Sequence, residues 1–315
     1  MNRDQPTDLA CQLPLYRPLQ PDIRSQSIQI PLSAGLTCPG YVLSRTDLTP
    51  FRCPGGSVLY LHGIQSHPGW FIGSAQAIAR SGLTVVMLTR RGSGSSDLPR
   101  GHARSAGVLL ADLDFAVDWL AGENQQGPCR GLGVSWGGKW LAAWAASRRE
   151  VPLASLTLAA PGICARRGPS GWTKLRIAAA LLTGRSRTRF AFGLDDPHLF
   201  TENPEMIDAM TADTLKLTDA TARFLFASRQ MDRALFKAPA GAIDLPVSLV
   251  LSAQDRIIDN DATRQELLRL VSGPERLTVH ELPGQHTLEF EPDAQNYYRV
   301  LVESLPPQIT RTLSG

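Results

Sequence analysis

The chain has 315 residues, of which 43% are hydrophobic and 19% charged, and its formal net charge is +3. This composition is typical of a soluble globular protein with a large core. So small a net charge argues against nucleic-acid binding by the chain as a whole. The cysteines stand at wide, irregular spacing without any C-x-x-C pair, so they indicate neither a zinc site nor a disulfide framework. They are Cys11, Cys38, Cys53, Cys129 and Cys164.

The first twenty residues lack the apolar stretch of a signal peptide. No window of the sequence approaches the length of uncharged, apolar chain that a membrane-spanning helix needs. We therefore expect a soluble, cytoplasmic protein with reduced thiols.

Apolar strands alternate with helices along most of the chain. The predicted strands are 27–32, 41–45, 57–63, 83–89, 131–135, 154–162, 245–255 and 276–284. The predicted helices are 69–82, 105–122, 136–149, 261–273 and 293–305. Strands that are apolar throughout and separated by helices predict an α/β fold with a mostly parallel central sheet and helices on both faces.

The alternation is interrupted between residues 161 and 240. This segment has a helical pattern with irregular joins, and its clearest helix is 218–237 with Thr218 as the N-cap. Such an insertion does not belong to the sheet, and we expect it to form a helical cap over one end. The expected organisation is a first core part at 1–160, a cap at 161–240 and a second core part at 241–315.

The segment GLGVSWGGKW, residues 131–140, places Ser135 where a predicted strand passes into a predicted helix. A G-x-S-x-G sequence in this position is typical of a nucleophile elbow, a sharp turn that exposes the serine hydroxyl. The residues two before and two after the serine, Gly133 and Gly137, must be small to avoid collision. The pentapeptide alone is a weak signal, and the strand–helix context strengthens it.

A serine hydroxyl needs a base to accept its proton, and the base needs a carboxylate to orient it. His286 follows a Pro-Gly turn after the last predicted strand, whereas His280 lies within that strand. Asp255 comes directly after an apolar strand, whereas Asp259 stands where the next helix begins and a carboxylate is favourable. We therefore predict that Ser135, His286 and Asp255 form the catalytic group.

The chain order of serine, aspartate and histidine is the order of the α/β-hydrolases. From about residue 25 onward the sequence resembles this superfamily. It is most similar to the capped lysophospholipase and monoacylglycerol-lipase-like branch, also described as serine aminopeptidase-like. The matching segments are LHG (61–63), RRGSGSSD (90–97), GVSWGG (133–138), SAQDRIID (252–259) and GQH (284–286). Each is weak alone, and together they are specific.

Acyl transfer also needs two backbone N–H groups that bind the oxyanion. One is expected from Trp136, the residue after the nucleophile. The resemblance implies that the second comes from Ile64, and that Gly63 lets this loop turn tightly beneath the serine. His62 is expected to stabilise the loop without taking part in catalysis.

Two other interpretations of these segments are weaker. The glycine-rich segment 90–97 follows a strand, but it matches neither a P-loop nor a dinucleotide fingerprint, and the resemblance implies a structural loop beside the site. His62 and His67 are five residues apart, but no third ligand accompanies them. We expect no metal and no cofactor.

Serine as the nucleophile predicts hydrolysis of a carboxylic ester through an acyl-enzyme. The resemblance favours a lipid-like ester, such as a monoacylglycerol or a lysophospholipid. The alternatives are an acyltransferase, an amide or thioester hydrolase with the same residues, and a ligand-binding receptor with slow turnover. The oligomeric state is left open.

The front of the expected cap, residues 164–190, carries seven basic residues and no acidic one. Apolar residues such as Trp172 are interspersed. In one interpretation the apolar residues pack on the core and the basic ones are solvated. In the other, the segment meets an anionic substrate or makes peripheral contact with an anionic membrane surface. The candidate contact residues are Trp172, Arg185, Arg187 and Arg189.

Overall fold

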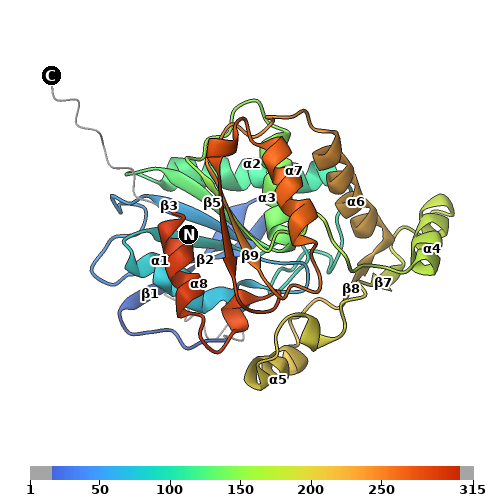
Figure 1. The fold of residues 1–315 in the computed structure, drawn as a ribbon, viewed down its shortest axis with the longest axis horizontal. Coiled ribbons are helices and arrows are strands. Elements are labelled where there is room, and N and C mark those ends of the chain that lie inside the picture. Colours follow the sequence, from blue (N-terminus) through green and yellow to red (C-terminus); the bar gives the residue numbers. More distant parts are fainter. Residues whose placement is uncertain (1–15, 306–315) are drawn as a thin grey trace.

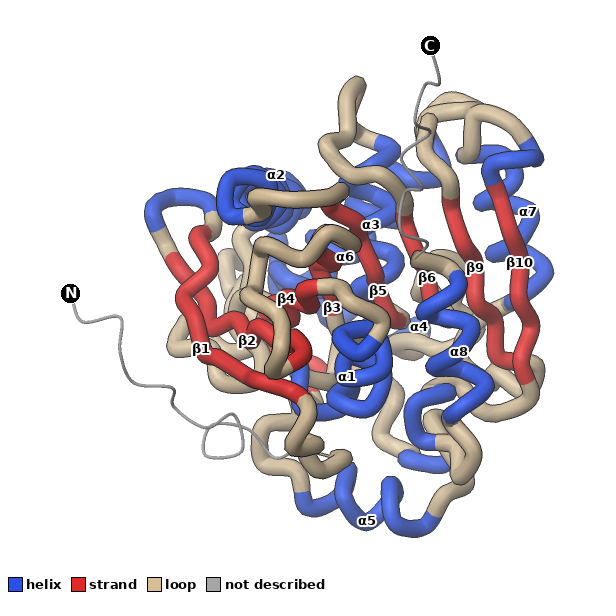
Figure 2. Tube along the Cα trace, turned by 90° about the vertical axis from the view of Figure 1, so that its left-hand side faces the viewer, coloured by secondary structure: helices blue, strands red, loops and turns tan. Residues whose placement is uncertain are grey.

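The computed structural model describes residues 16–305, so Cys11 and the expectation about a signal peptide fall outside the described residues. The main sheet has eight strands in the order β1-β2-β4-β3-β5-β6-β9-β10 (Figure 2). Their bounds are β1 Ile23–Pro31, β2 Thr37–Arg45, β3 Ser57–Leu61, β4 Thr84–Leu88, β5 Cys129–Val134, β6 Leu156–Ala159, β9 Val247–Ser252 and β10 Leu277–Leu282. β1 with β2, and β2 with β4, pair antiparallel, and all other neighbours pair parallel. The mostly parallel sheet predicted from the sequence is confirmed.

Helices cover both faces of the sheet (Figure 1). One face carries α1 (Ile72–Arg80) and α8 (Gln295–Glu303), which pack against each other. The other carries α2 (Ala106–Glu123), α3 (Trp136–Ala146) and α7 (Asn260–Leu270). β4 is apolar throughout because both of its faces are buried. Val86 and Leu88 face one layer of helices, and Val85 and Met87 face the other.

The elements between β6 and β9 add no strand to the eight-stranded sheet. They are α4 (Gly171–Leu182), β7 (Arg189–Ala191), α5 (Pro204–Ala212), β8 (Asp219–Thr221) and α6 (Ala222–Lys237). α4 and α5 project outward beyond the sheet (Figure 1). α6 differs, because it packs on α3 and buries Phe224, Ala227 and Met231 in the same apolar cluster as α2 and α3.

Two details of this insertion differ from the prediction. The segment holds a small antiparallel sheet of β7 and β8, which the helical pattern did not predict. The long helix begins three residues later than expected, because residues 219–221 pair with β7. Its N-cap is therefore Thr221, whose hydroxyl accepts from the N–H of Phe224, and not Thr218.

Two boundaries in the first part of the chain also differ. The first strand starts at Ile23, four residues before the predicted 27–32, because an edge strand with one neighbour tolerates polar residues. The predicted helix 69–82 is divided into a short 3-10 turn at Pro68–Phe71 and α1. No helix within residues 16–305 has both the length and the apolar character that crossing a bilayer requires.

Candidate active site

Ser135 stands in the tight turn between β5 and α3, with a φ of 54° and a ψ of −119°. A non-glycine residue is strained in this region, and the strain is tolerated where the surroundings fix the backbone. A Cβ on Gly133 would lie 2.6 Å from the carbonyl oxygen of Gly137, and a Cβ on Gly137 would lie 2.4 Å from that of Leu61. Any side chain at either elbow position would collide with the backbone, so both residues must be glycine.

Ser135, His286 and Asp255 form one chain of hydrogen bonds. The Nε2 atom of His286 lies 2.9 Å from the Oγ of Ser135, and its Nδ1 lies 2.8 Å from the Oδ2 of Asp255. His286 and Asp255 are buried, and Ser135 is partly exposed. The structure thus brings together three residues that lie 31 to 151 positions apart in the chain.

The other oxygen of Asp255 is held by the backbone. Its Oδ1 accepts from the N–H groups of Ile257 at 2.8 Å and Ile258 at 2.9 Å. Burial raises the pKa of this carboxyl, but the charge of His286 and these hydrogen bonds hold it below its ordinary value. Asp255 is therefore ionised and fixed, which suits a group that orients an imidazole and stabilises its charged form.

The residues weighed against these three occupy other positions. The carboxylate of Asp259 caps the N-terminus of α7 by accepting from the N–H of Ala262 at 3.0 Å. His280 lies within β10, as its position in the predicted strand indicated. Neither residue joins the hydrogen-bonded chain of Ser135.

The loop after β3 passes directly beneath Ser135. A Cβ on Gly63 would lie 3.4 Å from the Cβ of Ser135, so the loop approaches the nucleophile closely at this glycine. Among the hydrogen bonds of residues 16–305, the N–H groups of Ile64 and Trp136 donate to no protein group. Two unpaired backbone donors flank the serine, which is the arrangement that binding an oxyanion needs.

His62 and Arg90 hold this loop in place. The Nδ1 of His62 donates to the carbonyl of Gly63 at 2.9 Å, and its Nε2 accepts from the N–H of Arg90 at 3.1 Å. Burial, followed by the charge of Arg90, keeps the pKa of His62 well below its ordinary value, so the ring is neutral. This matches the stabilising role expected for His62.

Arg90 is a residue whose importance the sequence did not reveal. Its guanidinium is buried against the stacked rings of Trp136 and Phe224, 4.9 and 5.0 Å from their centroids, and it donates to the carbonyl of Ile64 at 2.8 Å. Burial lowers the pKa of Arg90 to about 9. One side chain thus connects both expected oxyanion donors with α6 of the insertion.

A second unforeseen cluster converges on Asp213, just after α5. Its Oδ2 accepts from the hydroxyl of Tyr16 at 3.0 Å, from the Nε2 of His67 at 2.9 Å and from the indole of Trp70 at 2.7 Å. Both ring nitrogens of His67 are therefore hydrogen-bonded within the protein. No group of three metal-ligating side chains occurs within residues 16–305. The cluster ties the insertion to the loop that follows β3, and sequence spacing gave no signal for it.

The candidate contact residues of the insertion separate into different roles. Trp172 is 68% exposed on α4, and Arg185 and Arg187 are exposed beyond the end of that helix. Arg189 is instead bound to the carboxylate of Asp219 and donates to the carbonyl of Arg100 at 2.7 Å. The carboxylate of Asp219 neutralises its charge, so Arg189 does not belong to a free basic surface.

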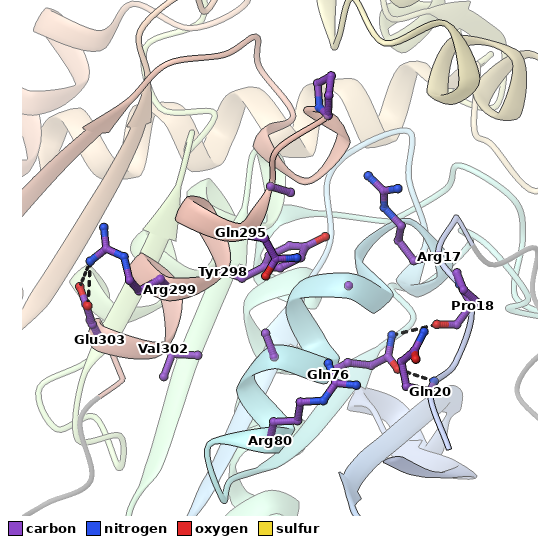
Figure 3. A pocket seen from close by; sticks show the side chains of 14 residues that line it. Arg17, Pro18, Gln20, Gln76, Arg80, Gln295, Tyr298, Arg299, Val302 and Glu303 are labelled. Carbon is purple, nitrogen blue, oxygen red and sulfur yellow. Dashed lines mark hydrogen bonds and ion pairs between the residues drawn. The ribbon is translucent and has the colours of Figure 1, made fainter. Parts of the chain in front are cut away.

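A cavity of about 750 Å³ lies on the face of the sheet that carries α1 and α8 (Figure 3). Its lining includes Arg17, Gln76 and Tyr298 but none of Ser135, His286 and Asp255. The amide of Gln76 is already paired with the backbone of the segment beside it. This cavity is separate from the hydrogen-bonded chain of Ser135.

Comparison with known proteins is consistent with the geometry. The family model described as serine aminopeptidase, S33, matches residues 52–293. The chain belongs to this family. The match confirms the resemblance that the sequence motifs indicated, and with it the enzyme class, a serine hydrolase of the α/β-hydrolase fold.

Individual relatives agree with the family. The chain is 28% identical over 250 residues to a monoacylglycerol lipase of Mycolicibacterium smegmatis, covering 78% of this chain and 86% of the relative. A monoacylglycerol lipase of Paleococcus ferrophilus is 23% identical, with a TM-score of 0.69 over 81% of this chain and 95% of that structure. A soluble variant of the monoglyceride lipase of Saccharomyces cerevisiae is 17% identical, with a TM-score of 0.70 over 92% of this chain and 95% of the other. The two structures show a shared fold.

Proposed function

We propose that the chain hydrolyses carboxylic esters through an acyl-enzyme on Ser135. The observation that carries this proposal is the unbroken hydrogen-bonded chain from the Ser135 hydroxyl through His286 to the ionised Asp255. His286 takes the proton of Ser135 as the hydroxyl oxygen attacks the ester carbonyl, and then gives that proton to the departing alkoxide. Water, activated by His286 in the same way, releases the acid.

The oxyanion of each tetrahedral intermediate is bound by the N–H groups of Ile64 and Trp136. Both are unpaired among the described residues, and both are anchored by Arg90. Donors that are already oriented stabilise the developing charge without reorganisation.

The substrate we propose is a lipid-like ester, a monoacylglycerol or a lysophospholipid. The relative from Mycolicibacterium smegmatis, which aligns with most of this chain, is named a monoacylglycerol lipase. A panel of monoacylglycerols, lysophospholipids and short p-nitrophenyl esters tests this, with Ser135→Ala as the control for contaminating esterase. If the protein cleaved only the short esters, it would still be an ester hydrolase, but the lipid substrate would be rejected. If a fluorophosphonate failed to label Ser135, the acyl-enzyme would be rejected.

We further propose that α4 contacts an anionic lipid surface. The exposed stripe of α4 consists of Trp172, Leu175 and Leu182, which are 68%, 60% and 88% exposed, while Ile177 on the opposite side is buried. These positions are spaced by three and seven residues and so lie along one side of the helix. Lys174 and Arg176 flank the stripe, as in helices that lie in a membrane interface.

Sedimentation with vesicles tests the lipid contact. The protein should pellet with anionic vesicles more than with neutral ones, and less as salt increases. Replacing Trp172, Leu175 and Leu182 by serine should reduce pelleting while cleavage of short soluble esters continues. Equal, salt-insensitive pelleting with both kinds of vesicle would contradict the proposal.

A further inference from the structure

A second cavity, of about 650 Å³, lies between the core loop 91–104 and the insertion. Its lining includes no acidic residue. The basic residues that line it are Arg91, His102 and Arg104 from the core side and Arg187 and Arg223 from the insertion. Five basic side chains from two separate parts of the chain therefore converge on one hollow.

Only part of this charge is neutralised within the protein. Arg91 is paired with Asp112 through two hydrogen bonds of 2.7 Å. Arg104, Arg187 and Arg223 have no carboxylate partner within residues 16–305. By contrast, the neighbouring Arg189, which does not line the cavity, is bound to Asp219. Three of the four arginines that line the cavity are thus left without a counter-charge among the described residues.

The helices around the cavity increase the positive potential. α2 starts directly after Arg104, with Ser105 as its N-cap, and α6 starts at Ala222 with Arg223 in its first turn. Neither helix has an acidic residue in its first turn. Basic residues are unfavourable at the positive end of a helix dipole, whereas an anion is stabilised there. Both helices place arginine where an isolated helix would favour a carboxylate.

His102 lies in the same hollow, with its Nδ1 3.0 Å from the hydroxyl of Thr221, the N-cap of α6. Burial and then the charges of Arg187, Arg223, Arg91 and Arg104 lower its pKa. Four guanidinium groups therefore contribute to the electrostatic potential at this ring. The charges of the arginines from the core loop and from the insertion therefore add at this ring.

We propose that this cavity binds a phosphate group, carried by a free phosphate monoester or by a lipid headgroup. Planar guanidinium groups donate paired hydrogen bonds to phosphate oxygens, and three unpaired arginines supply more than enough positive charge to neutralise a dianion. Bound phosphate contacts Arg104 on the core side and Arg187 and Arg223 on the insertion side, and so links the two parts. The site is separate from Ser135, and the proposal does not depend on ester hydrolysis.

Calorimetric titration of the full-length protein with inorganic phosphate and with glycerol 3-phosphate, at low ionic strength, tests the site. We expect saturable binding with a dissociation constant on the order of 1 mM or below. The double variant Arg187→Gln/Arg223→Gln should weaken it about tenfold or more, and Arg104→Gln, from the opposite wall, should weaken it in the same direction. Arg185→Gln is the matched control, because Arg185 is an exposed arginine two residues away that does not line the cavity.

Vesicles distinguish the two sources of phosphate. Phosphatidylcholine vesicles with and without phosphatidic acid are compared, and inorganic phosphate is added as a competitor. Binding of the small phosphates assigns the site to a free monoester. Binding only to phosphatidic acid, with a loss in the double variant that clearly exceeds the general weakening expected in Arg185→Gln, as for any exposed arginine, assigns it to a headgroup. Absence of any binding that depends on Arg187 and Arg223, or equal weakening by Arg185→Gln, overturns the proposal; thermal melting verifies that each variant is folded.

Discussion

The backbone of the turn at Ser135 is closely packed on the neighbouring strand, whereas α4 rests on its neighbours along one side only. At the elbow, a Cβ on Gly137 would overlap the carbonyls of Leu61 and His62, while a Cβ on Gly171 at the start of α4 would meet nothing within 4 Å. His286 and Asp255 are buried and hydrogen-bonded, while Leu182 is 88% exposed. The packed turn and loops around Ser135 therefore hold the reacting groups in fixed positions, whereas α4 presents an exposed apolar surface to solvent.

This contrast predicts where substitutions change chemistry and where they change only recognition. Five predictions follow from it, from the largest expected effect to the smallest.

The largest effect is expected at the hydrogen-bonded chain. Ser135→Ala should lower kcat by roughly a millionfold and Asp255→Asn by roughly ten-thousandfold, because the groups act as one unit. Asp259→Asn should retain most activity, since Asp259 caps α7 and has no contact with His286. Steady-state hydrolysis of a p-nitrophenyl ester ranks the variants, and a lower rate for Asp259→Asn than for Asp255→Asn would exclude our assignment of the acid.

The next comparison concerns packing alone. Gly137→Ala should destabilise the fold by about 3 kcal/mol or more, because its Cβ would meet the backbone of β3 and not a movable side chain. Gly171→Ala should leave stability unchanged or raise it by about 0.5 kcal/mol, because alanine favours a helix and the space is open. Denaturant unfolding of both variants measures the difference, and equal stabilities would show that the elbow is less rigid than its contacts indicate.

The oxyanion donors give a smaller but specific effect on rate. Ile64→Pro removes an N–H group and should lower kcat by about a hundred- to a thousandfold. Ile64→Val keeps the N–H and should be tolerated. Proline can also distort the loop, so thermal melting accompanies the kinetics. A folded Ile64→Pro variant with unchanged kcat would remove Ile64 from the site.

A buried acid beside the His286 loop makes stability depend on pH. Glu289 is 1% exposed, and burial raises its pKa to about 7, although Ser74 and Tyr298 donate to one of its oxygens. Because the folded pKa is raised, the protonated form stabilises the protein fully below pH 4.5, and this stability is lost as the pH rises through 7. α4 contains no comparable buried acid.

The measurement is the unfolding free energy of the wild type and of Glu289→Gln between pH 5 and 8. Relative to the variant, the wild type should lose about 3 kcal/mol over this range, since each pKa unit corresponds to about 1.4 kcal/mol. Parallel curves for the two proteins would show that Glu289 does not titrate in the fold.

The sequence predicted the parts of the molecule that local pattern determines. Strand and helix alternation predicted the parallel sheet, and the G-x-S-x-G segment between β5 and α3 predicted the strained turn at Ser135. Polar residues at strand ends predicted which aspartate and histidine would meet, because the carboxyl ends of parallel strands lie at one edge of the sheet.

What the sequence did not predict depends on contacts between distant segments. In the sequence, Arg90 is one charge in a glycine-rich loop. Only the packing of α6 against α3 brings together the two aromatic rings that bury its guanidinium. Asp213 likewise becomes a hydrogen-bond centre only when α5 meets Tyr16 and Trp70. The short strand β8 was missed because residues 219–221 continue a helical pattern until their pairing with β7 overrides it.

The smallest effect separates two neighbouring arginines of the insertion. Arg185 is exposed without a carboxylate partner within residues 16–305, whereas Arg189 is bound to Asp219 and to the carbonyl of Arg100. Arg185→Gln should therefore weaken partitioning onto anionic vesicles about fivefold at low salt, which corresponds to about 1 kcal/mol, and leave the melting temperature unchanged. Arg189→Gln should lower the melting temperature, because it removes the side-chain bonds from β7 to Asp219 and to the carbonyl of Arg100, and leave partitioning of the folded protein unchanged. If Arg189→Gln weakened partitioning as much as Arg185→Gln, the lipid contact would extend over β7, and the exposed surface would be larger than α4 and the residues just after it.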